Sequence, residues 1–102
     1  GSSEFVPSEE NIAEYIAHFF NIELDVLKGS TQSRDVVHAR QIAMYLIRRL
    51  RSTPLSDIGK FFGGRDHTTV LYSLNQVEKK MRVDPAFAET VKEITTNINS
   101  KT

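Results

Sequence analysis

Apolar residues recur at helical spacing along almost the whole chain, and no segment alternates apolar and polar positions with a period of two. Ser8 can cap a first helix, and the acidic Glu9 and Glu10 follow it, where the helix dipole favours negative charge. The apolar stripe of this helix is Ile12, Tyr15, Ile16, Phe19 and Phe20. The pattern predicts a helix that buries this stripe.

Turn residues divide the remaining chain into five further helices. These are predicted over residues 24–28, 35–51, 55–62 and 66–81, with a last helix from Asp84-Pro85 onward. Gly29 ends the short second helix, and Pro54 ends the long third one because it disfavours helical geometry at the preceding residue. The stripe of the last helix is Phe87, Val91, Ile94 and Ile98. The fold class is therefore all-α.

The length of 102 residues suits one domain with a single core. Residues 1–5 resemble an expression scar with a short lead-in, so we expect the domain over residues 6–102. The sequence holds no cysteine, which excludes disulfides, thiolate nucleophiles and cysteine-based zinc sites. No apolar run approaches the roughly 18–20 residues that a membrane-spanning helix needs.

Charge is balanced over the chain but distributed unevenly. Thirteen basic and thirteen acidic side chains cancel. Residues 1–33 carry six acids and one base, whereas residues 34–66 carry seven bases and three acids. A net charge of zero is therefore compatible with a basic face and with a nucleic-acid partner.

Three arginines of the long third helix fall opposite its apolar arc on a helical wheel. The apolar arc is Ala39, Ile42, Ala43, Leu46, Ile47 and Leu50. Arg40, Arg48 and Arg51 share the other face, which holds no acid to pair with them. The face is either an ordinary solvated surface or a surface for phosphate oxygens, which suit guanidinium groups.

The predicted helices on either side of Gly63-Gly64 describe a helix-turn-helix, in which the second helix lies in the DNA major groove. A polar run, residues 65–69, occupies the start of this second helix. Asp66 can accept a hydrogen bond from a cytosine amine, and His67 and Thr68 can bond a base or touch a thymine methyl. The alternative is an ordinary helix start, capped by Asp66 with help from Thr69.

Catalysis and metal binding find little support. The three histidines, His18, His38 and His67, lie far apart without a second ligand at helical spacing. The sequence has no recognisable nucleophile elbow and no Gly-x4-Gly-Lys-Ser/Thr loop for a nucleotide. We therefore expect no enzyme and no cofactor in this chain, with a hydrolase that uses His67 as the enzymatic alternative.

Two stretches, Ala39-Arg-Gln-Ile-Ala-Met-Tyr-Leu46 and Ile58-Gly-Lys-Phe-Phe-Gly-Gly-Arg-Asp-His-Thr-Thr-Val70, resemble the C-terminal DNA-binding domain of the bacterial DnaA replication initiators. The run Gly-Gly-Arg-Asp-His-Thr-Thr-Val is the signature of that family. The resemblance covers the chain from about Val6 to its end. It implies a six-helix, Trp-repressor-like helix-turn-helix domain that binds double-stranded DNA at origin boxes of the TTATNCACA type.

The same resemblance implies a context for the domain. An ATP-binding oligomerisation domain precedes it in the intact family members, so ATP is expected there and not in this chain. The implied location is the bacterial cytoplasm, at the nucleoid, with the isolated domain monomeric. Regulatory proteins and acidic phospholipids are further partners that the resemblance suggests for the full-length protein.

The resemblance also assigns roles to individual residues. Asp66, His67 and Thr68 match base-reading positions of the major groove. The positions that match phosphate contacts are Arg40, Gln41, Arg48, Leu55, Ser56, Arg65, Thr69 and Gln76, with Leu55 and Ser56 acting through main-chain amides. The family's minor-groove arginine is Gln32 here, with Arg34 two residues later, and Gln76 and Ser56 replace a common lysine and proline. We expect weaker electrostatics and a minor-groove contact shared between Gln32 and Arg34.

Two other functions are also compatible with the sequence. One is a helix-turn-helix transcription regulator of another family, which would prefer a different DNA sequence. The other is a docking module for proteins or acidic membranes, formed by the acidic first helix and the last helix. Binding through several phosphates weakens steeply with salt, whereas an apolar docking surface hardly responds, so salt dependence separates them.

Overall fold

The computed structural model describes residues 7–100, so the lead-in expected over residues 1–5 lies outside the described residues. The helices are α1 (Glu9–Phe19), α2 (Leu24–Lys28), α3 (Arg34–Arg51), α4 (Leu55–Phe61), α5 (His67–Val83) and α6 (Pro85–Ser100). The predicted all-α fold of six helices with a helix-turn-helix is confirmed. No helix within residues 7–100 is long and apolar enough to cross a membrane.

The helix starts follow the local chemistry of the sequence. The Ser8 hydroxyl accepts a hydrogen bond from the Asn11 amide at 3.1 Å, as a cap residue should. The Asp84 carboxylate accepts from the Phe87 amide at 3.2 Å and starts α6. The long helix α3 ends at Arg51, and the next residue, Ser52, has a φ of 55° in the left-handed region, two positions before Pro54. Local signals thus set the starts of α1 and α6 and the end of α3.

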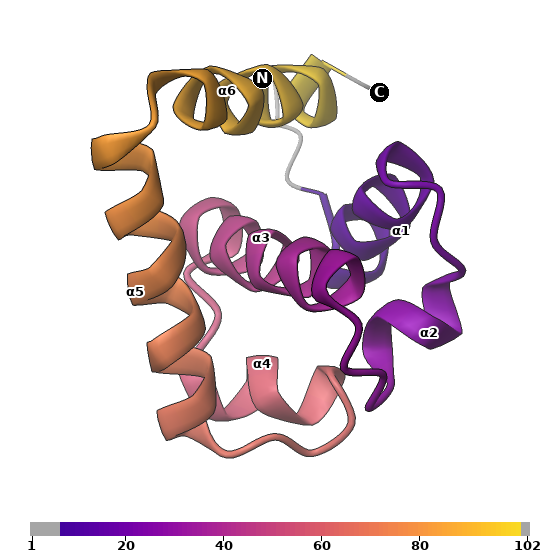
Figure 1. Ribbon diagram of the computed structural model, residues 1–102. Coiled ribbons are helices and arrows are strands. Elements are labelled where there is room, and N and C mark those ends of the chain that lie inside the picture. The colour runs from indigo at the N-terminus through magenta and orange to yellow at the C-terminus, as the bar shows by residue number, and fades with distance from the viewer. Residues whose placement is uncertain (1–6, 101–102) are drawn as a thin grey trace, which may run out of the picture.

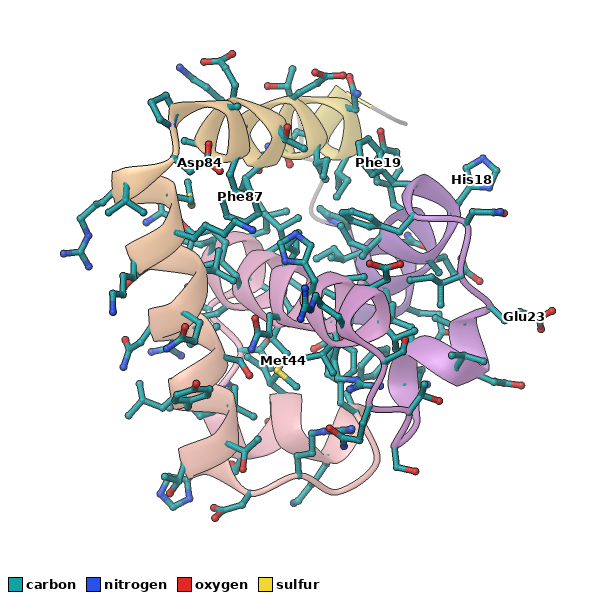
Figure 2. The ribbon with its side chains drawn as sticks, in the orientation of Figure 1. His18, Phe19, Glu23, Met44, Asp84 and Phe87 are labelled. Atoms are coloured by element: carbon teal, nitrogen blue, oxygen red, sulfur yellow. The ribbon has the colours of Figure 1, made fainter. Side chains whose placement is uncertain are left out.

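Helix α3 forms the centre of the domain. It packs against α1, α2, α4 and α5, and α6 packs on the far end of α5. Figure 1 shows α3 crossing the middle of the molecule, with α5 along one side and α4 beneath it. Met44 is 1% exposed and points from α3 toward α4 in Figure 2. The wheel left Met44 and Tyr45 off the apolar arc, but both are buried because neighbours surround α3 on several sides.

The predicted stripe of α1 is wrong at one position. Phe19 is 41% exposed, although Ile12 and Ile16 of the same stripe are fully buried. The helix ends at Phe19, and the chain turns away at Asn21, whose φ is 57°. The ring of Phe19 therefore lies at the rim of the core, where it contacts Tyr15 and Phe20. Phe20 packs inward, with its ring 6.0 Å from that of His38.

Candidate nucleic-acid interface

Glycines of α4 and the following turn hold the helix-turn-helix together. The carbonyl of Gly59 accepts from the amides of Gly64 and Arg65 at 2.9 and 2.8 Å. A Cβ at Gly59 would lie 2.0 Å from the Arg65 carbonyl oxygen, so the chain passes directly over this glycine. Gly63 and Gly64 have φ of 85° and 83°, which other residues adopt at a cost. These glycines fix the direction in which α5 leaves the turn.

The polar run at the start of α5 faces solvent. Asp66 is the N-cap, and its Oδ1 accepts from the Thr68 amide at 3.2 Å. The Nδ1 atom of His67 lies 3.3 Å from the same oxygen. The side chains of residues 66–69 are exposed, whereas Val70 is fully buried and holds the helix on the core. The predicted cap is confirmed, and base reading by this run stays a prediction.

A second polar surface lies on the loop before α3 and on the first turns of that helix. A shallow cavity of about 580 Å³ is lined by Gln32, Arg34, Val37, His38 and Gln41. The structure thus brings together both predicted minor-groove residues and one predicted phosphate contact. Gln32 is exposed, and its Nε2 donates to the Ser30 carbonyl within the loop at 3.2 Å.

His38 joins this cavity although no sequence signal placed it there. Its ring lies 5.3 Å from that of Phe87 and 6.0 Å from that of Phe20. Burial lowers the pKa of His38, the charge of Lys80 lowers it further, and Asp35 acts in the opposite direction. His38 therefore favours the neutral form and packs against Phe20, which follows α1, and against Phe87 of α6.

The expectation that Arg40 lies on an exposed face is wrong. The residue is 4% exposed, because α2 and the loop after it cover this side of α3. Its Nε donates to the Leu27 carbonyl at 2.7 Å, and its Nη2 donates to Thr31 and Val26 at 3.1 and 3.3 Å. Burial and the charge of Arg65 lower the pKa of Arg40 to about 10, so it stays charged at neutral pH. Arg40 is a structural clamp.

Arg65 also turns inward. Its Nη2 donates to the Gly29 carbonyl at 2.6 Å, and its Nη1 donates to the Phe62 carbonyl. Arg65 therefore joins the loop after α2 to the helix-turn-helix. Sequence reasoning missed both clamps because main-chain carbonyls, which every residue carries, leave no pattern in the sequence.

The other two arginines of α3 differ from each other. Arg48 is exposed and donates through Nη1 to the Thr53 carbonyl at 2.9 Å, beside the start of α4. Arg51 has an acidic partner after all: its Nε lies 3.3 Å from Glu9 Oε2. The backbone hydrogen bond of Glu9 lowers the pKa of that carboxyl, as do Arg51 and Thr53, against the effect of burial. Both residues are exposed, but the guanidinium of Arg51 is already engaged by Glu9 and by the Pro7 carbonyl, so Arg48 is the better candidate for phosphate binding.

The remaining predicted phosphate contacts lie on α4 and α5. Leu55 and Ser56 form the first turn of α4, where no side chain caps the free amides. Thr69 is exposed on the first turn of α5, and Gln76 is half-buried two turns later. These four positions stay predictions.

Two exposed residues of α5 carry large apolar groups. Leu71 is 45% and Tyr72 is 59% exposed, and they follow the polar run after the buried Val70. The position of Tyr72 opposite the buried side of the helix follows from the helical wheel. Leu71 gave no signal, because its apolar type suggests core. Both side chains extend the exposed surface of α5 beyond the polar run.

Comparisons with known proteins agree with this geometry. Residues 9–77 match the family described as "Bacterial dnaA protein helix-turn-helix". Relatives named "Chromosomal replication initiator protein DnaA" include those of Lachnoclostridium phytofermentans, 42% identical over 88 residues, covering 86% of this chain and 19% of the relative. The relative from Nostoc punctiforme is 38% identical over 98 residues, covering 96% of this chain and 21% of the relative.

A solved structure shows the same fold. It is titled "Crystal structure of DNA replication initiation factor", superposes with a TM-score of 0.82, and is 26% identical to this chain. The match covers 91% of this chain and 29% of that chain. The chain spans about a fifth of the length of the two curated relatives described above.

Proposed function

The chain belongs to the bacterial DnaA helix-turn-helix family, and on that premise we propose that it binds double-stranded DNA sequence-specifically, at origin boxes of the TTATNCACA type. One observation carries the proposal: the exposed polar run of residues 66–69 begins the second helix of a helix-turn-helix whose angle is fixed by glycines. Such a helix presents its first residues to base edges in the major groove.

The roles divide by position. Asp66, His67 and Thr68 read bases in the major groove, and Gln32 and Arg34 enter the minor groove beside it. Phosphate contacts come from Gln41, Arg48, Leu55, Ser56, Thr69 and Gln76. Arg40 and Arg65 are left out of this set, because their guanidinium groups bind main-chain carbonyls. The domain docks the initiator on the origin, and we assign no catalytic step to it.

In the full-length protein, an upstream domain would bind ATP and assemble the initiator, at the nucleoid of the bacterial cytoplasm. The present chain then binds the origin DNA and so determines where the initiator is placed. Contacts with regulatory proteins or acidic phospholipids belong to the same full-length context. An affinity that hardly changes with salt would favour docking through an apolar surface over DNA binding.

The test of base reading is His67→Ala. We expect affinity for a TTATNCACA duplex to fall by about 1–3 kcal/mol, and affinity for a scrambled duplex to change much less, because phosphate contacts remain. His18→Ala is the matched control: His18 is an exposed histidine on α1, and Figure 2 shows it pointing to solvent at the other side of the molecule from α5. An equal loss on both duplexes would contradict base reading by His67.

Selection of random duplexes tests the box itself. We expect the bound pool to converge on a TTATNCACA-like consensus, and a different consensus would point to a regulator of another kind. Repeating the binding at several salt concentrations gives the number of phosphates contacted, since the slope of affinity against salt scales with that number.

A further inference from the structure

The end of α2 sits directly on the turn of the helix-turn-helix. Arg65 Nη2 donates to the Gly29 carbonyl at 2.6 Å. The Lys28 ammonium lies 4.2 Å from the centre of the Phe61 ring. A Cβ at Gly63 would lie 3.2 Å from the Lys28 carbonyl oxygen, so the two backbones are close as well. Segments far apart in sequence therefore form one junction between the end of α2 and the turn that joins α4 to α5.

The loop that leaves this junction is anchored a second time. Arg40 Nη2 donates to the Thr31 carbonyl at 3.1 Å, two residues beyond the Gly29 carbonyl that Arg65 holds. Gln32 follows at once and bonds back to the Ser30 carbonyl. The backbone on both sides of Ser30 is thus fixed before the chain reaches Gln32.

Arg65 connects this anchored loop to the start of α5. It directly precedes Asp66, the N-cap of that helix. Its planar guanidinium holds two carbonyls of different segments, Phe62 in the turn and Gly29 in the loop. A lysine keeps the charge but not the rigid fork, so it cannot hold two carbonyls in a fixed geometry.

We propose that Arg65 is a positioning residue for DNA recognition: it holds the loop of residues 29–33 at a fixed place relative to the start of α5. Gln32 and Arg34 then reach the minor groove when α5 lies in the adjacent major groove. This inference rests on the proposed function, and it replaces a phosphate contact by Arg65 with an indirect role.

The test separates the two grooves chemically. Replacing adenine by 2,6-diaminopurine adds an amine in the minor groove and leaves the major-groove pattern of the A·T pair unchanged. Replacing adenine by 7-deazaadenine removes the N7 acceptor of the major groove. Each adenine of a TTATNCACA duplex is replaced in turn, and the affinity of the chain for each duplex is measured.

For the wild-type chain we expect an affinity loss of about fivefold or more from diaminopurine at pairs facing the loop, and a comparable loss from deazaadenine at pairs facing α5. In Arg65→Lys, the diaminopurine loss should shrink to within about twofold, because the loop no longer holds Gln32 and Arg34 in place. The deazaadenine loss should persist.

Arg82→Lys is the matched control. It makes the same change on the exposed last turn of α5, and both losses should stay at wild-type size. Circular dichroism melts show whether the variants are folded at the assay temperature. If Arg65→Lys is not, Lys28→Met loosens the same junction more gently by removing the ammonium from the Phe61 ring.

A full diaminopurine loss in folded Arg65→Lys would overturn the proposal, and so would a proportional reduction of both losses, which a general loosening of the fold produces. A wild-type chain that prefers the box but shows no diaminopurine loss would also overturn it, together with the minor-groove roles of Gln32 and Arg34, while leaving sequence-specific binding to the box intact. A wild-type chain without preference for the box over a scrambled duplex would overturn the proposed function itself.

Discussion

Helices α5 and α6 begin with the same chemistry and serve different ends. Each starts at an aspartate whose Oδ1 accepts from a first-turn amide at 3.2 Å, Asp66 for α5 and Asp84 for α6. The residues that follow differ. On α6, Phe87 is 8% exposed and points toward the core in Figure 2, whereas on α5 residues 67–69 face solvent. An aspartate cap alone therefore does not distinguish α5 from α6. The exposure of the first helical turn after the cap is what distinguishes them.

The two starts also differ in what precedes them. A single residue, Asp84, joins α5 to α6. Helix α5, by contrast, follows a turn in which Gly63 and Gly64 have positive φ and the Arg65 carbonyl lies against Gly59. The direction of α6 follows from its packing on α5. The direction of α5 depends on glycines that are outside the helix, and this makes its exposed first turn sensitive to changes on α4.

The largest effect is expected from Gly59→Ala, which places a methyl group against the backbone just before α5. The new Cβ would lie 2.0 Å from the Arg65 carbonyl oxygen, so the backbone must move. We expect the free energy of unfolding to fall by about 4 kcal/mol or more, measured by urea denaturation.

Gly64→Ala is the control for this prediction. No atom lies within 4 Å of a Cβ there, so only its φ of 83° is strained. The expected loss is about 1–2 kcal/mol. Equal losses at both glycines would mean that the close approach over Gly59 does not hold α5 in place.

Phe87→Ala is the corresponding test at the start of α6, because it removes the buried side chain of the first turn. Removing this buried ring should lower the free energy of unfolding by about 3 kcal/mol, because it leaves a cavity beside His38. Affinity for the box, measured at a temperature where the variant is folded, should stay unchanged. A loss of box affinity in the folded variant would show that α6 takes part in recognition.

The sequence predicted the helices and their caps better than the contacts between distant segments. Periodicity and caps were enough for six helices, since apolar spacing and cap residues act within a few positions of the chain. The polar run of residues 65–69 was predicted at the start of α5 as well; residues 66–69 of that run are exposed, whereas Arg65 turns inward.

Interactions between distant segments were not predictable in this way. Arg40 lay on the polar side of the wheel but is covered by α2. The contact of Arg65 with Gly29 joins positions 36 residues apart, through a carbonyl that carries no side-chain signal. Gly59 looked like an ordinary small residue of α4, and only the packed chain shows what passes over it.

A smaller effect separates the two caps. Asparagine caps helices about as well as aspartate, so Asp66→Asn and Asp84→Asn should each change stability by less than about 0.5 kcal/mol. Asp66→Asn also replaces one acceptor oxygen by a donor at the base edge. We expect it to weaken binding to the box by about 1 kcal/mol relative to a scrambled duplex, while Asp84→Asn leaves that ratio unchanged. If both variants kept the same ratio of box affinity to scrambled-duplex affinity, Asp66 would act only as a helix cap.

The smallest expected effect concerns pH at the start of α6, where His38 contacts Phe87. The rings of Phe20 and Phe87 lie beside His38, and the charges of Lys80 on α5 and Asp35 on its own helix act on it. Burial and Lys80 lower the pKa of His38 below its ordinary value of 6.5, so the unfolded chain binds the proton more readily. The stabilisation is complete above about pH 6.5 and is lost as the pH falls toward the lower, folded-state pKa. The melting temperature of the wild-type chain should therefore drop between about pH 7.5 and about pH 5.5, and the drop should be smaller in His38→Gln, which cannot titrate. An equal drop in both proteins would mean that His38 does not link the start of α6 to pH.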